Sequence, residues 1–279
     1  MKKIFAIIAS LAFAAAAFTG CGGDQPAAKS GAASNAASEA KVLKVGATPV
    51  PHAEILEKVK PVLEKEGIRL EIVEFSDYVQ PNLALNDKEL DANFFQHEPY
   101  LKNFVEEHKE LKLKNAAGIH VEPMGVYSRK IKDLKNLTDG ASIAIPNDPT
   151  NGGRALLLLD KAGLLKIKDG VGEKATVQDI EKNPRNIQFR EVEAAQLPRT
   201  LEDVDAAVIN TNYAMQIDLV PTKDALFMED RTSPYVNIIA VREGDENRPE
   251  IQALLKALKS DDIKKFIEEN YKGAIVPAF

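Results

Sequence analysis

The sequence has few of the residues on which several common kinds of site depend. Its single cysteine, Cys21, rules out an internal disulfide and a Cys-x-x-Cys metal site. Its four histidines show neither the His-Glu-x-x-His pattern nor a paired metal-ligand spacing. No Gly-x-Ser-x-Gly nucleophile motif is present. We therefore expect no metal, no cofactor and no enzymatic activity.

Basic residues and long apolar runs are also scarce. The 279 residues include 36 Lys and Arg against 42 Asp and Glu, which gives a net charge of −6. Nucleic-acid-binding proteins obtain affinity by neutralising phosphates with Lys and Arg, so we expect no nucleic-acid partner. Only one long apolar run exists, which excludes a polytopic membrane protein. The length predicts about two globular domains.

That apolar run is at the start of the chain. Two lysines precede fifteen residues, Ile4 to Phe18, interrupted only by one serine. Because a helix needs about 20 apolar residues to cross a bilayer, this run fits a cleaved signal peptide over residues 1–20 better than an anchor. The next residues, Phe18-Thr19-Gly20-Cys21, resemble the bacterial lipobox, although Phe18 stands where leucine is usual. The resemblance implies cleavage before Cys21 and acylation of that cysteine. The alternative is a plain signal peptide followed by a free thiol.

Residues 21–40 have the composition of a flexible linker. They are rich in Ala, Gly and Ser and contain no aromatic or β-branched residue. Such a segment cannot bury enough apolar surface to offset the loss of chain entropy on folding. As a random coil it reaches on the order of 25 Å, so it would tether a folded domain near a membrane surface.

From Lys41 onward the sequence alternates between strand and helix patterns, which is typical of an α/β fold with mostly parallel sheets. We predict two lobes, one formed by residues 41–120 and 238–279 and the other by residues 121–237. The chain would cross between them near 119–127 and 233–239. The predicted strands are Val42 to Ala47, Ile68 to Glu74, Ala92 to Phe95, Val121 to Arg129, Ser142 to Ile145, Ile187 to Val192, Ala206 to Ile209 and Val236 to Val241. The predicted helices are Pro51 to Glu66, Pro81 to Asn86, His97 to His108, Gly153 to Ala162, Pro249 to Leu258 and Asp261 to Tyr271.

The turn from Pro146 to Arg154 is the first candidate binding element. Two glycines allow a close approach of backbone to ligand, and the start of the following helix favours an anion. If the helix begins at Gly153, Arg154 lies in its first turn, where a cation is unfavourable. A bound carboxylate would relieve this conflict and take a bidentate pair of hydrogen bonds from the guanidinium. The alternative is a solvated arginine on a surface helix.

An aromatic group is the second candidate. Strand alternation sends Phe94 and Phe95 to opposite faces, while His97 and Tyr100 share one face of the next helix. Together with Tyr78 these residues predict an apolar pocket with polar tips, which suits an uncharged side chain and especially a sulfur atom. The alternative is that they are core aromatics beside a histidine cap.

Two asparagines complete the set of candidates. Asn210 ends a predicted strand, and Asn237 lies on the second predicted crossing. A side-chain amide offers both a donor and an acceptor, so either residue can bind an ammonium or a carboxylate group. Each is also common in turns and helix caps.

In several of these stretches the chain resembles the methionine-binding lipoproteins of bacterial ABC importers, the NlpA/MetQ-type substrate-binding proteins. The resemblance covers nearly all of Val42 to Phe279. The segments that carry it are VGATPVPHAEI (Val45–Ile55), FSDYVQPNLALNDKELDANFFQHEPY (Phe75–Tyr100), IPNDPTNGGRALLLLD (Ile145–Asp160), EAAQLPRT (Glu193–Thr200), AAVINTNY (Ala206–Tyr213) and SPYVNI (Ser233–Ile238).

The resemblance implies a two-lobed, type II-like periplasmic-binding-protein fold that closes over a free amino acid. By that resemblance, four residues of the first lobe would line the side-chain pocket (Tyr78, Phe95, His97 and Tyr100). Arg154 would bind the α-carboxylate, Asn210 and Asn237 would bind the α-amino and carboxylate groups, and Asn147 would assist.

The same resemblance implies a function in transport. The protein would bind methionine, most simply L-methionine, and deliver it to a permease driven by an ATPase. We expect a monomer anchored to the cell membrane by lipid, facing the periplasm or the exterior. Gly22 is not the aspartate associated with inner-membrane retention, so the inner and outer membranes both stay open. The alternatives are a same-fold binding protein for another amino acid, D-methionine or a methionine dipeptide, and, more distantly, a surface adhesin or enzyme that reuses the fold.

Overall fold

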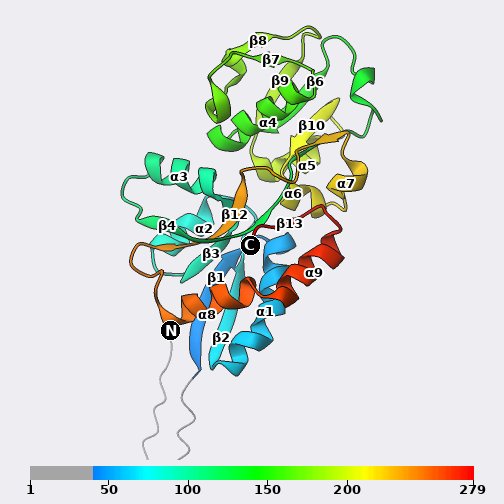
Figure 1. Ribbon diagram of the computed structural model, residues 1–279. Coiled ribbons are helices and arrows are strands. Elements are labelled where there is room, and N and C mark those ends of the chain that lie inside the picture. The colour runs from blue at the N-terminus through cyan, green and yellow to red at the C-terminus, as the bar shows by residue number, and fades with distance from the viewer. Residues whose placement is uncertain (1–39) are drawn as a thin grey trace, which may run out of the picture. The chain divides into compact units, whose positions relative to one another are not determined.

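The computed structural model describes residues 40–279, in which the strands and helices form two groups, each built around its own main sheet (Figure 1). The predicted signal peptide, the predicted lipidation site at Cys21 and residues 21–39 of the linker predicted over 21–40 lie outside these residues. We call the group built on the larger sheet the first lobe and the other group the second lobe. None of the helices in residues 40–279 is both long enough and apolar enough to cross a bilayer.

The first lobe takes its elements from both ends of the folded chain. They are β1 (Lys41–Ala47), η1 (Pro49–Ala53), α1 (Glu54–Lys65), β2 (Ile68–Glu74), α2 (Gln80–Asn86), β3 (Ala92–His97), α3 (Glu98–Glu107), β4 (Leu113–Val121), β12 (Val236–Arg242), α8 (Pro249–Leu258), α9 (Asp261–Tyr271) and β13 (Val276–Pro277).

The second lobe is formed by the middle of the chain. Its elements are β5 (Gly125–Tyr127), η2 (Leu134–Asn136), β6 (Ser142–Pro146), α4 (Pro149–Lys161), β7 (Lys166–Ile167), η3 (Gly172–Lys174), η4 (Val177–Asp179), β8 (Ile180–Lys182), β9 (Gln188–Val192), η5 (Ala194–Gln196), α5 (Leu197–Thr200), β10 (Ala206–Ile209), α6 (Thr211–Met215), α7 (Pro221–Asp224) and β11 (Phe227–Met228).

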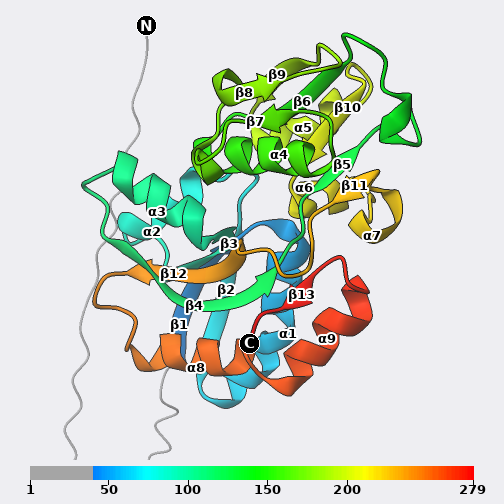
Figure 2. The same cartoon turned by 45° about the horizontal axis from the view of Figure 1, so that its top comes forward.

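Both main sheets are mixed, so the prediction of mostly parallel sheets is wrong. The first has the strand order β13-β4-β12-β3-β1-β2, and only the pairs β1–β2 and β1–β3 are parallel. The second has the order β11-β5-β10-β6-β9, with β10–β6 and β6–β9 parallel. The reason lies in the crossings. The chain leaves the first lobe through β4 and returns through β12, and neighbouring strands that lead away from and back to one sheet must run in opposite directions (Figure 2).

The predicted crossings near 119–127 and 233–239 overlap the end of β4, β5 and the start of β12. The exact lobe boundaries stay a prediction. Strand β4 itself was missed by the sequence analysis, which placed strand character only from Val121 onward.

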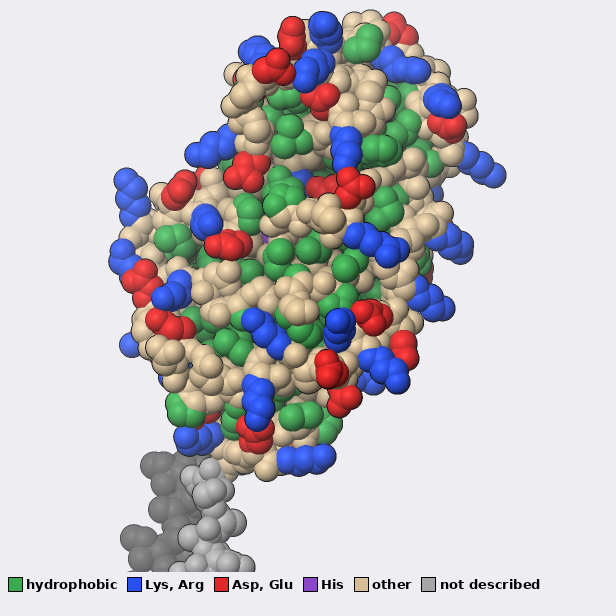
Figure 3. Space-filling model, viewed as in Figure 1, with side chains coloured by type: hydrophobic (Ala, Val, Ile, Leu, Met, Phe, Trp, Pro, Cys, Tyr) green, Lys and Arg blue, Asp and Glu red, His purple; other side chains and the backbone are tan. Residues whose placement is uncertain are grey.

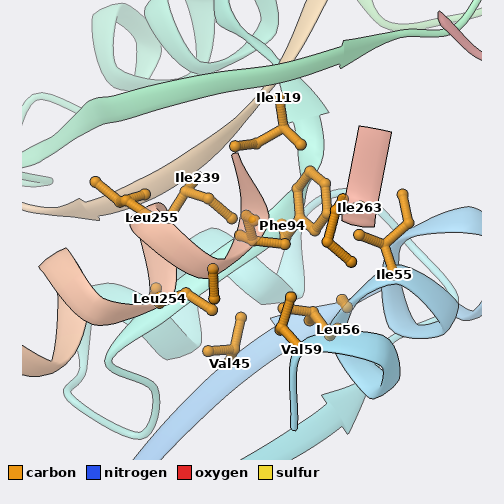
Figure 4. Packing of buried hydrophobic residues seen from close by; sticks show 14 of the residues in the cluster. Val45, Ile55, Leu56, Val59, Phe94, Ile119, Ile239, Leu254, Leu255 and Ile263 are labelled. Carbon is orange, nitrogen blue, oxygen red and sulfur yellow. The ribbon is translucent and has the colours of Figure 1, made fainter. Parts of the chain in front are cut away.

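Each sheet packs side chains on both faces. In β3, Phe94 lies in the core formed with α1, α8 and α9 (Figure 4), whereas Phe95 lies in the core formed with α2 and α3. The predicted alternation of these two rings is therefore confirmed. Helix α1 buries Ile55 and its apolar partners as predicted, except that Val62, at the edge of the apolar stripe, is 44% exposed.

Helix α4 begins four residues earlier than predicted. The side chain of Asp148 caps it by accepting a hydrogen bond from the backbone N–H of Asn151, and Pro149 occupies the first helical position, which proline favours. Arg154 therefore lies in the second turn, and the predicted conflict with a first-turn dipole does not arise. At the other end, Gly163 adopts a φ of +75° just after the helix, so the predicted glycine cap is confirmed.

The surface carries charges of both signs. On the face shown in Figure 3, Lys and Arg side chains alternate with Asp and Glu side chains, without a broad field of one sign. Several of these charges form exposed ion pairs within one lobe, such as Lys102 with Glu98 on α3.

Candidate functional site

A small hollow lies between the two lobes, where β3 and β10 end and β12 begins. Its empty volume is about 330 Å³, counted together with the open solvent at its mouth. Binding sites of α/β folds commonly lie beyond the carboxyl ends of strands, as here. The hollow is lined by Tyr78, Phe95, Gln96, His97, Tyr100, Glu122, Asn151, Arg154, Asn210, Thr211, Asn212 and Asn237.

The structure brings the predicted site residues together with one exception. Asn147 is exposed and does not line the hollow. Its backbone N–H donates to the carbonyl of Val192, which extends the pairing of β6 with β9 beyond the end of the strand. This pairing leaves the Asn147 side chain on the surface.

Aromatic rings form the wall of the hollow that belongs to the first lobe. The ring centroids of Tyr78 lie 5.8 Å from Phe95 and 5.7 Å from Tyr100, and those of Phe95 and Tyr100 are 6.2 Å apart. The Tyr100 hydroxyl donates to the backbone carbonyl of Tyr78 at 3.1 Å, which fixes the two rings relative to each other. Such a wall suits an apolar, polarisable side chain, and a thioether gains about 0.3–1.5 kcal/mol from each ring contact.

A chain of hydrogen bonds fixes the orientation of the amides opposite this wall. The Asp148 carboxylate, which can only accept, takes hydrogen bonds from Nδ2 of Asn151 at 3.0 Å. Oδ1 of Asn151 therefore faces the other way, where it lies 3.0 Å from Nε2 of His97 and accepts from Nδ2 of Asn210 at 2.9 Å. Because Nδ2 of Asn210 is used in this way, its Oδ1 is left as an acceptor.

His97 is held in one neutral tautomer. Its Nδ1 accepts the backbone N–H of Tyr100 at 3.1 Å, so the proton is on Nε2 and is donated to Asn151 across the lobes. Burial and, to a smaller extent, the nearby Arg154 charge lower the pKa of His97 to about 3, against the opposing effect of the Asn151 hydrogen bond. His97 is thus a neutral structural donor at physiological pH and carries no positive charge into the hollow.

Arg154 is buried and already paired. Its Nε and Nη2 donate to the two carboxylate oxygens of Glu229 at 2.7 and 2.6 Å, and Nη2 also donates to the carbonyl of Glu122 at 2.8 Å. The guanidinium carbon lies 4.2 Å from the centre of the Tyr235 ring. The bidentate edge that the sequence analysis assigned to a ligand is therefore taken by Glu229, and Nη1 is the nitrogen left to face the hollow.

Four polar atoms around the hollow find no partner within residues 40–279. Oδ1 of Asn210 and Nδ2 of Asn212 are buried without a hydrogen bond, and the Tyr78 hydroxyl donates to the other end of the Asn212 amide at 2.6 Å. Nη1 of Arg154 and Nδ2 of Asn237 likewise make no hydrogen bond to a described residue. One acceptor and three donors therefore converge on a space next to an aromatic wall, a pattern complementary to an ammonium and a carboxylate carried by one molecule.

A buried group of three residues that the sequence did not predict, His52, His120 and Glu122, lies behind Asn237. Oε1 of Glu122 is 2.8 Å from Nε2 of His120 and 3.1 Å from Nε2 of His52, and the latter nitrogen also lies 3.1 Å from Oδ1 of Asn237. Two ligands of a tetrahedral zinc ion are about 3.3 Å apart at bond lengths of about 2.0–2.1 Å. The shorter 2.8 Å separation fits a hydrogen bond from a neutral His120 to the carboxylate, and Nε2 of His52 makes its hydrogen bond to Asn237.

Burial explains the protonation of this group. It lowers the pKa of His52 to about 4 and that of His120 to about 3. Burial raises the pKa of Glu122, against the opposing effects of His52, Arg154 and the Asn212 backbone hydrogen bond. Oε2 of Glu122 accepts the backbone N–H of Asn212 at 3.1 Å. The group therefore orients two of the amides that face the hollow, Asn212 and Asn237.

Three hydrogen bonds link the lobes directly across the hollow. They join His97 to Asn151, the Tyr78 hydroxyl to Asn212, and the Tyr213 hydroxyl to the carbonyl of Ser76 at 3.1 Å. These contacts require the lobes to be close together. The structure therefore shows the closed arrangement.

Some of the lining residues that the sequence analysis passed over carried a usable signal. Asn151 lies three positions before Arg154 in the same turn, so a helix starting at Asp148 would have placed both on one face. Asn212 stands two residues after Asn210. Glu122 and Glu229 had no such signal, since acidic residues are frequent in this chain and only the fold brings these two to the hollow and to Arg154.

Comparisons with known proteins agree on one group. The family model described as NlpA lipoprotein matches residues 43–279. A protein of Bacillus subtilis (strain 168) named methionine-binding lipoprotein MetQ is 43% identical over 281 residues, which cover 99% of each chain. Among solved structures, a nutrient-binding protein from Burkholderia cenocepacia bound to methionine matches with a TM-score of 0.82 and 49% identity, over 85% of this chain and 100% of the other. A periplasmic substrate-binding protein of an ABC transporter from Coxiella burnetii matches with a TM-score of 0.81 and 44% identity, over 85% and 100% of the two chains.

Proposed function

The chain belongs to the NlpA lipoprotein family, and from this premise we propose that it is the substrate-binding lipoprotein of an ABC importer and captures methionine. The observation that carries the proposal is a set of polar atoms that face an aromatic wall. Oδ1 of Asn210 and Nδ2 of Asn212 are buried without a partner, and Nη1 of Arg154 and Nδ2 of Asn237 make no hydrogen bond to residues 40–279. A free amino acid with an apolar side chain fits both features, because its ammonium and carboxylate groups pair with the polar atoms and its side chain packs against the aromatic wall. The relatives that are named or titled for methionine support the choice of side chain.

Each half of the ligand has its partners. The thioether side chain packs against Tyr78, Phe95 and Tyr100. The carboxylate accepts from Nη1 of Arg154 and from the amide of Asn237, and the ammonium donates to Oδ1 of Asn210. His97 lines the hollow as well, and its hydrogen bond to Asn151 holds the Asn210 amide in the required orientation.

Binding is coupled to closure because the partners belong to different lobes. The aromatic wall belongs to the first lobe, whereas Arg154 and Asn210 belong to the second. A ligand shifts such an equilibrium from 1:99 to 99:1 when it binds the closed form about 5.5 kcal/mol more tightly than the open form. Burial of an apolar side chain contributes about 1.5–3 kcal/mol, and each hydrogen bond to a charged group contributes about 1.5–3 kcal/mol. A few contacts made only on closure therefore suffice.

The lining residues also favour binding over catalysis. They include no serine, cysteine or lysine that is placed to act as a nucleophile, and His97 and Glu122 are both committed to hydrogen bonds within the protein. We infer that the protein releases methionine unchanged to a membrane permease driven by an ATPase, acting as a monomer. No cofactor or metal takes part in this cycle.

The location follows from the start of the chain. We propose that Cys21 is lipidated and anchors the protein to a cell membrane, with the folded domain facing the periplasm or the exterior. Two or more acyl chains are needed for stable anchoring, which multiple acylation of one cysteine provides. In a cell with two membranes, cell fractionation shows which of them carries the protein.

Calorimetric titration tests the proposed ligand. The protein is first unfolded and refolded to remove any ligand that has copurified, and it is then titrated with L-methionine, D-methionine, a methionine dipeptide, leucine and glutamine. We expect L-methionine to bind with one site per chain and more tightly than the others. Mass spectrometry of the ligand released from the native protein should show methionine. Preference for leucine, glutamine or a dipeptide would reassign the ligand within the same fold, and absence of binding by every compound would refute the amino-acid site.

A further inference from the structure

Glu229 accepts the bidentate hydrogen bonds of Arg154, and other contacts also fix its position. It directly follows β11, and its backbone N–H donates to the carbonyl of Met124 at 2.9 Å. Its Oε2 accepts from the backbone N–H of Met124 at 3.0 Å and from the hydroxyl of Ser233 at 3.2 Å. Met124 stands just after the chain has crossed into the second lobe, and Ser233 stands just before it crosses back. Glu229 therefore ties together the two crossings.

The pairing of Arg154 with Glu229 determines which part of the guanidinium faces the hollow. Glu229 holds Nε and one hydrogen of Nη2, and the carbonyl of Glu122 holds the other hydrogen of Nη2. The Tyr235 ring lies against the guanidinium at 4.2 Å, so rotation out of the plane is restricted as well. The hollow is lined by Arg154 but not by Glu229, which places it on the side of the guanidinium away from that carboxylate. Nη1, at that opposite edge, is left with two free hydrogens.

The pairing also stabilises a buried charge when no ligand is present. Arg154 is 3% exposed, and a buried cation without a partner is strongly destabilising. Burial, the largest single effect, lowers the pKa of Arg154, but the charge and hydrogen bonds of Glu229 together with the nearby Tyr235 and Glu122 raise the pKa overall. The arginine therefore stays charged and stays in place in the empty site.

We propose that Glu229 is a positioning residue that orients Arg154 toward the ligand carboxylate and connects this contact to both crossings between the lobes. The inference rests on the proposed function, since it takes the ligand to be an amino acid with a free carboxylate. Ligand binding would therefore be connected to the crossings between the lobes. A ligand that accepts a hydrogen bond from Nη1 contacts a guanidinium that is hydrogen-bonded to Glu122 on the first crossing and, through Glu229, is linked to Met124 and Ser233.

The test compares Glu229→Gln with Asp230→Asn. The second variant is a matched control, because it removes the same charge from the neighbouring residue, whose side chain is 69% exposed and pairs with Lys161 at the surface. We expect Glu229→Gln to weaken L-methionine binding at least 10-fold and Asp230→Asn to change it less than 2-fold. Affinities are measured by calorimetry on the full folded domain, and circular dichroism shows whether each variant is folded.

A second ligand separates positioning from a general structural effect. Methioninol has the side chain and amino group of methionine but no carboxylate, and its affinity is measured by competition at millimolar concentration. If Glu229 acts through Arg154, Glu229→Gln weakens methionine binding but leaves methioninol binding within 2-fold, so the preference for methionine falls by the same factor as its affinity.

The outcomes are distinct. Equal losses for both ligands, or methionine binding that is unchanged or tighter in Glu229→Gln, would overturn the inference and leave the proposed function standing. Failure of the unmodified protein to bind methionine would instead refute the proposed function.

Discussion

At the scale of single residues, the site depends on how amides are oriented. An asparagine presents a donor or an acceptor according to which way its amide is turned. Here the Asp148 carboxylate sets Asn151, and Asn151 sets Asn210 with the help of His97. The unpaired oxygen of Asn210 is therefore a consequence of a carboxylate that does not itself line the hollow.

Arg154 gives the sharpest prediction at this scale. Arg154→Ala should weaken methionine binding more than 100-fold, because it removes the only guanidinium that lines the hollow among residues 40–279. It should also lower the free energy of unfolding by about 3 kcal/mol, since the Glu229 side chain, 12% exposed, loses its partner. Calorimetry and urea denaturation measure the two effects. Arg199→Ala on the surface of the same lobe is the control, and an unchanged methionine affinity in Arg154→Ala would remove the central contact from the proposal.

At the scale of elements, helix α4 carries most of the second lobe's contribution to the site. Its start is set by Asp148 and Pro149, and the same first two turns present Asn151 and Arg154 to the hollow. Near its N-terminal end, the helix packs closely at Gly153 against the backbone of Glu173 and Ala175. A Cβ on Gly153 would overlap the carbonyl oxygen of Glu173 and lie 3.2 Å from the backbone nitrogen of Ala175.

We therefore expect Gly153→Ala to destabilise the protein, although helix propensity alone predicts that it stabilises it. Propensity alone predicts a gain of about 1 kcal/mol when alanine replaces glycine inside a helix. The overlap with backbone atoms, which cannot turn aside, predicts a loss of about 1–3 kcal/mol. Methionine affinity should fall too, because α4 must shift away from the 172–175 segment. Thermal denaturation with and without methionine measures both, and a more stable variant would show that this contact is not tight.

At the scale of the whole molecule, three histidines are buried in the neutral form, and stability must therefore depend on pH. The pKa values of His52, His97 and His120 are lowered to about 4, 3 and 3, whereas an unfolded histidine has a pKa of about 6.5. Below pH 6.5 the unfolded chain binds protons that the folded chain cannot. Stability is therefore lost as the pH falls, by roughly 1 kcal/mol for each histidine and pH unit.

Two carboxyl groups act in the opposite sense. Burial raises the pKa of Glu122 and Asp148, so the stability that they contribute by protonation is present at low pH and lost as the pH rises through their folded pKa. Their effect extends from the unfolded pKa near 4 up to the raised folded pKa, and over that range it opposes the effect of the three histidines. The urea midpoint should fall steadily from pH 7 to pH 5 at constant ionic strength. A flat profile in the unmodified protein would contradict the buried neutral histidines.

The membrane anchor is tested in cells. Cys21→Ser should move the protein from the membrane fraction to the soluble fraction and abolish incorporation of a labelled fatty acid, because two or more acyl chains bind a bilayer far more strongly than an unmodified linker does. Immunoblotting of fractions measures the shift, with an unrelated integral membrane protein as the control. Retention of Cys21→Ser in the membrane would argue against lipid anchoring at this residue.

Much of the element order was readable from the sequence. Helices Pro249–Leu258 and Asp261–Tyr271 begin and end where predicted, because an amphipathic period and clear boundary residues mark them. Strand β4 was missed because its run, LKNAAGIHV, contains small and polar residues whose fit to a strand depends on pairing with β12 and β13. The residues that line the hollow were mostly found because glycine turns, aromatic clusters and strand-end asparagines are local features.

The sequence by itself determined the alternation of strands and helices, the aromatic and amide character of the candidate site, and the resemblance to a transport family. It could do so because periodicity and residue type are local properties of the chain. Only the tertiary structure decided that Glu229 takes the bidentate edge of Arg154, that Asn147 stays on the surface, and that His52, His120 and Glu122 meet behind Asn237. These pairings join residues that are far apart in the chain, and a carboxylate among 42 acquires a role only when folding places a buried cation or imidazole beside it.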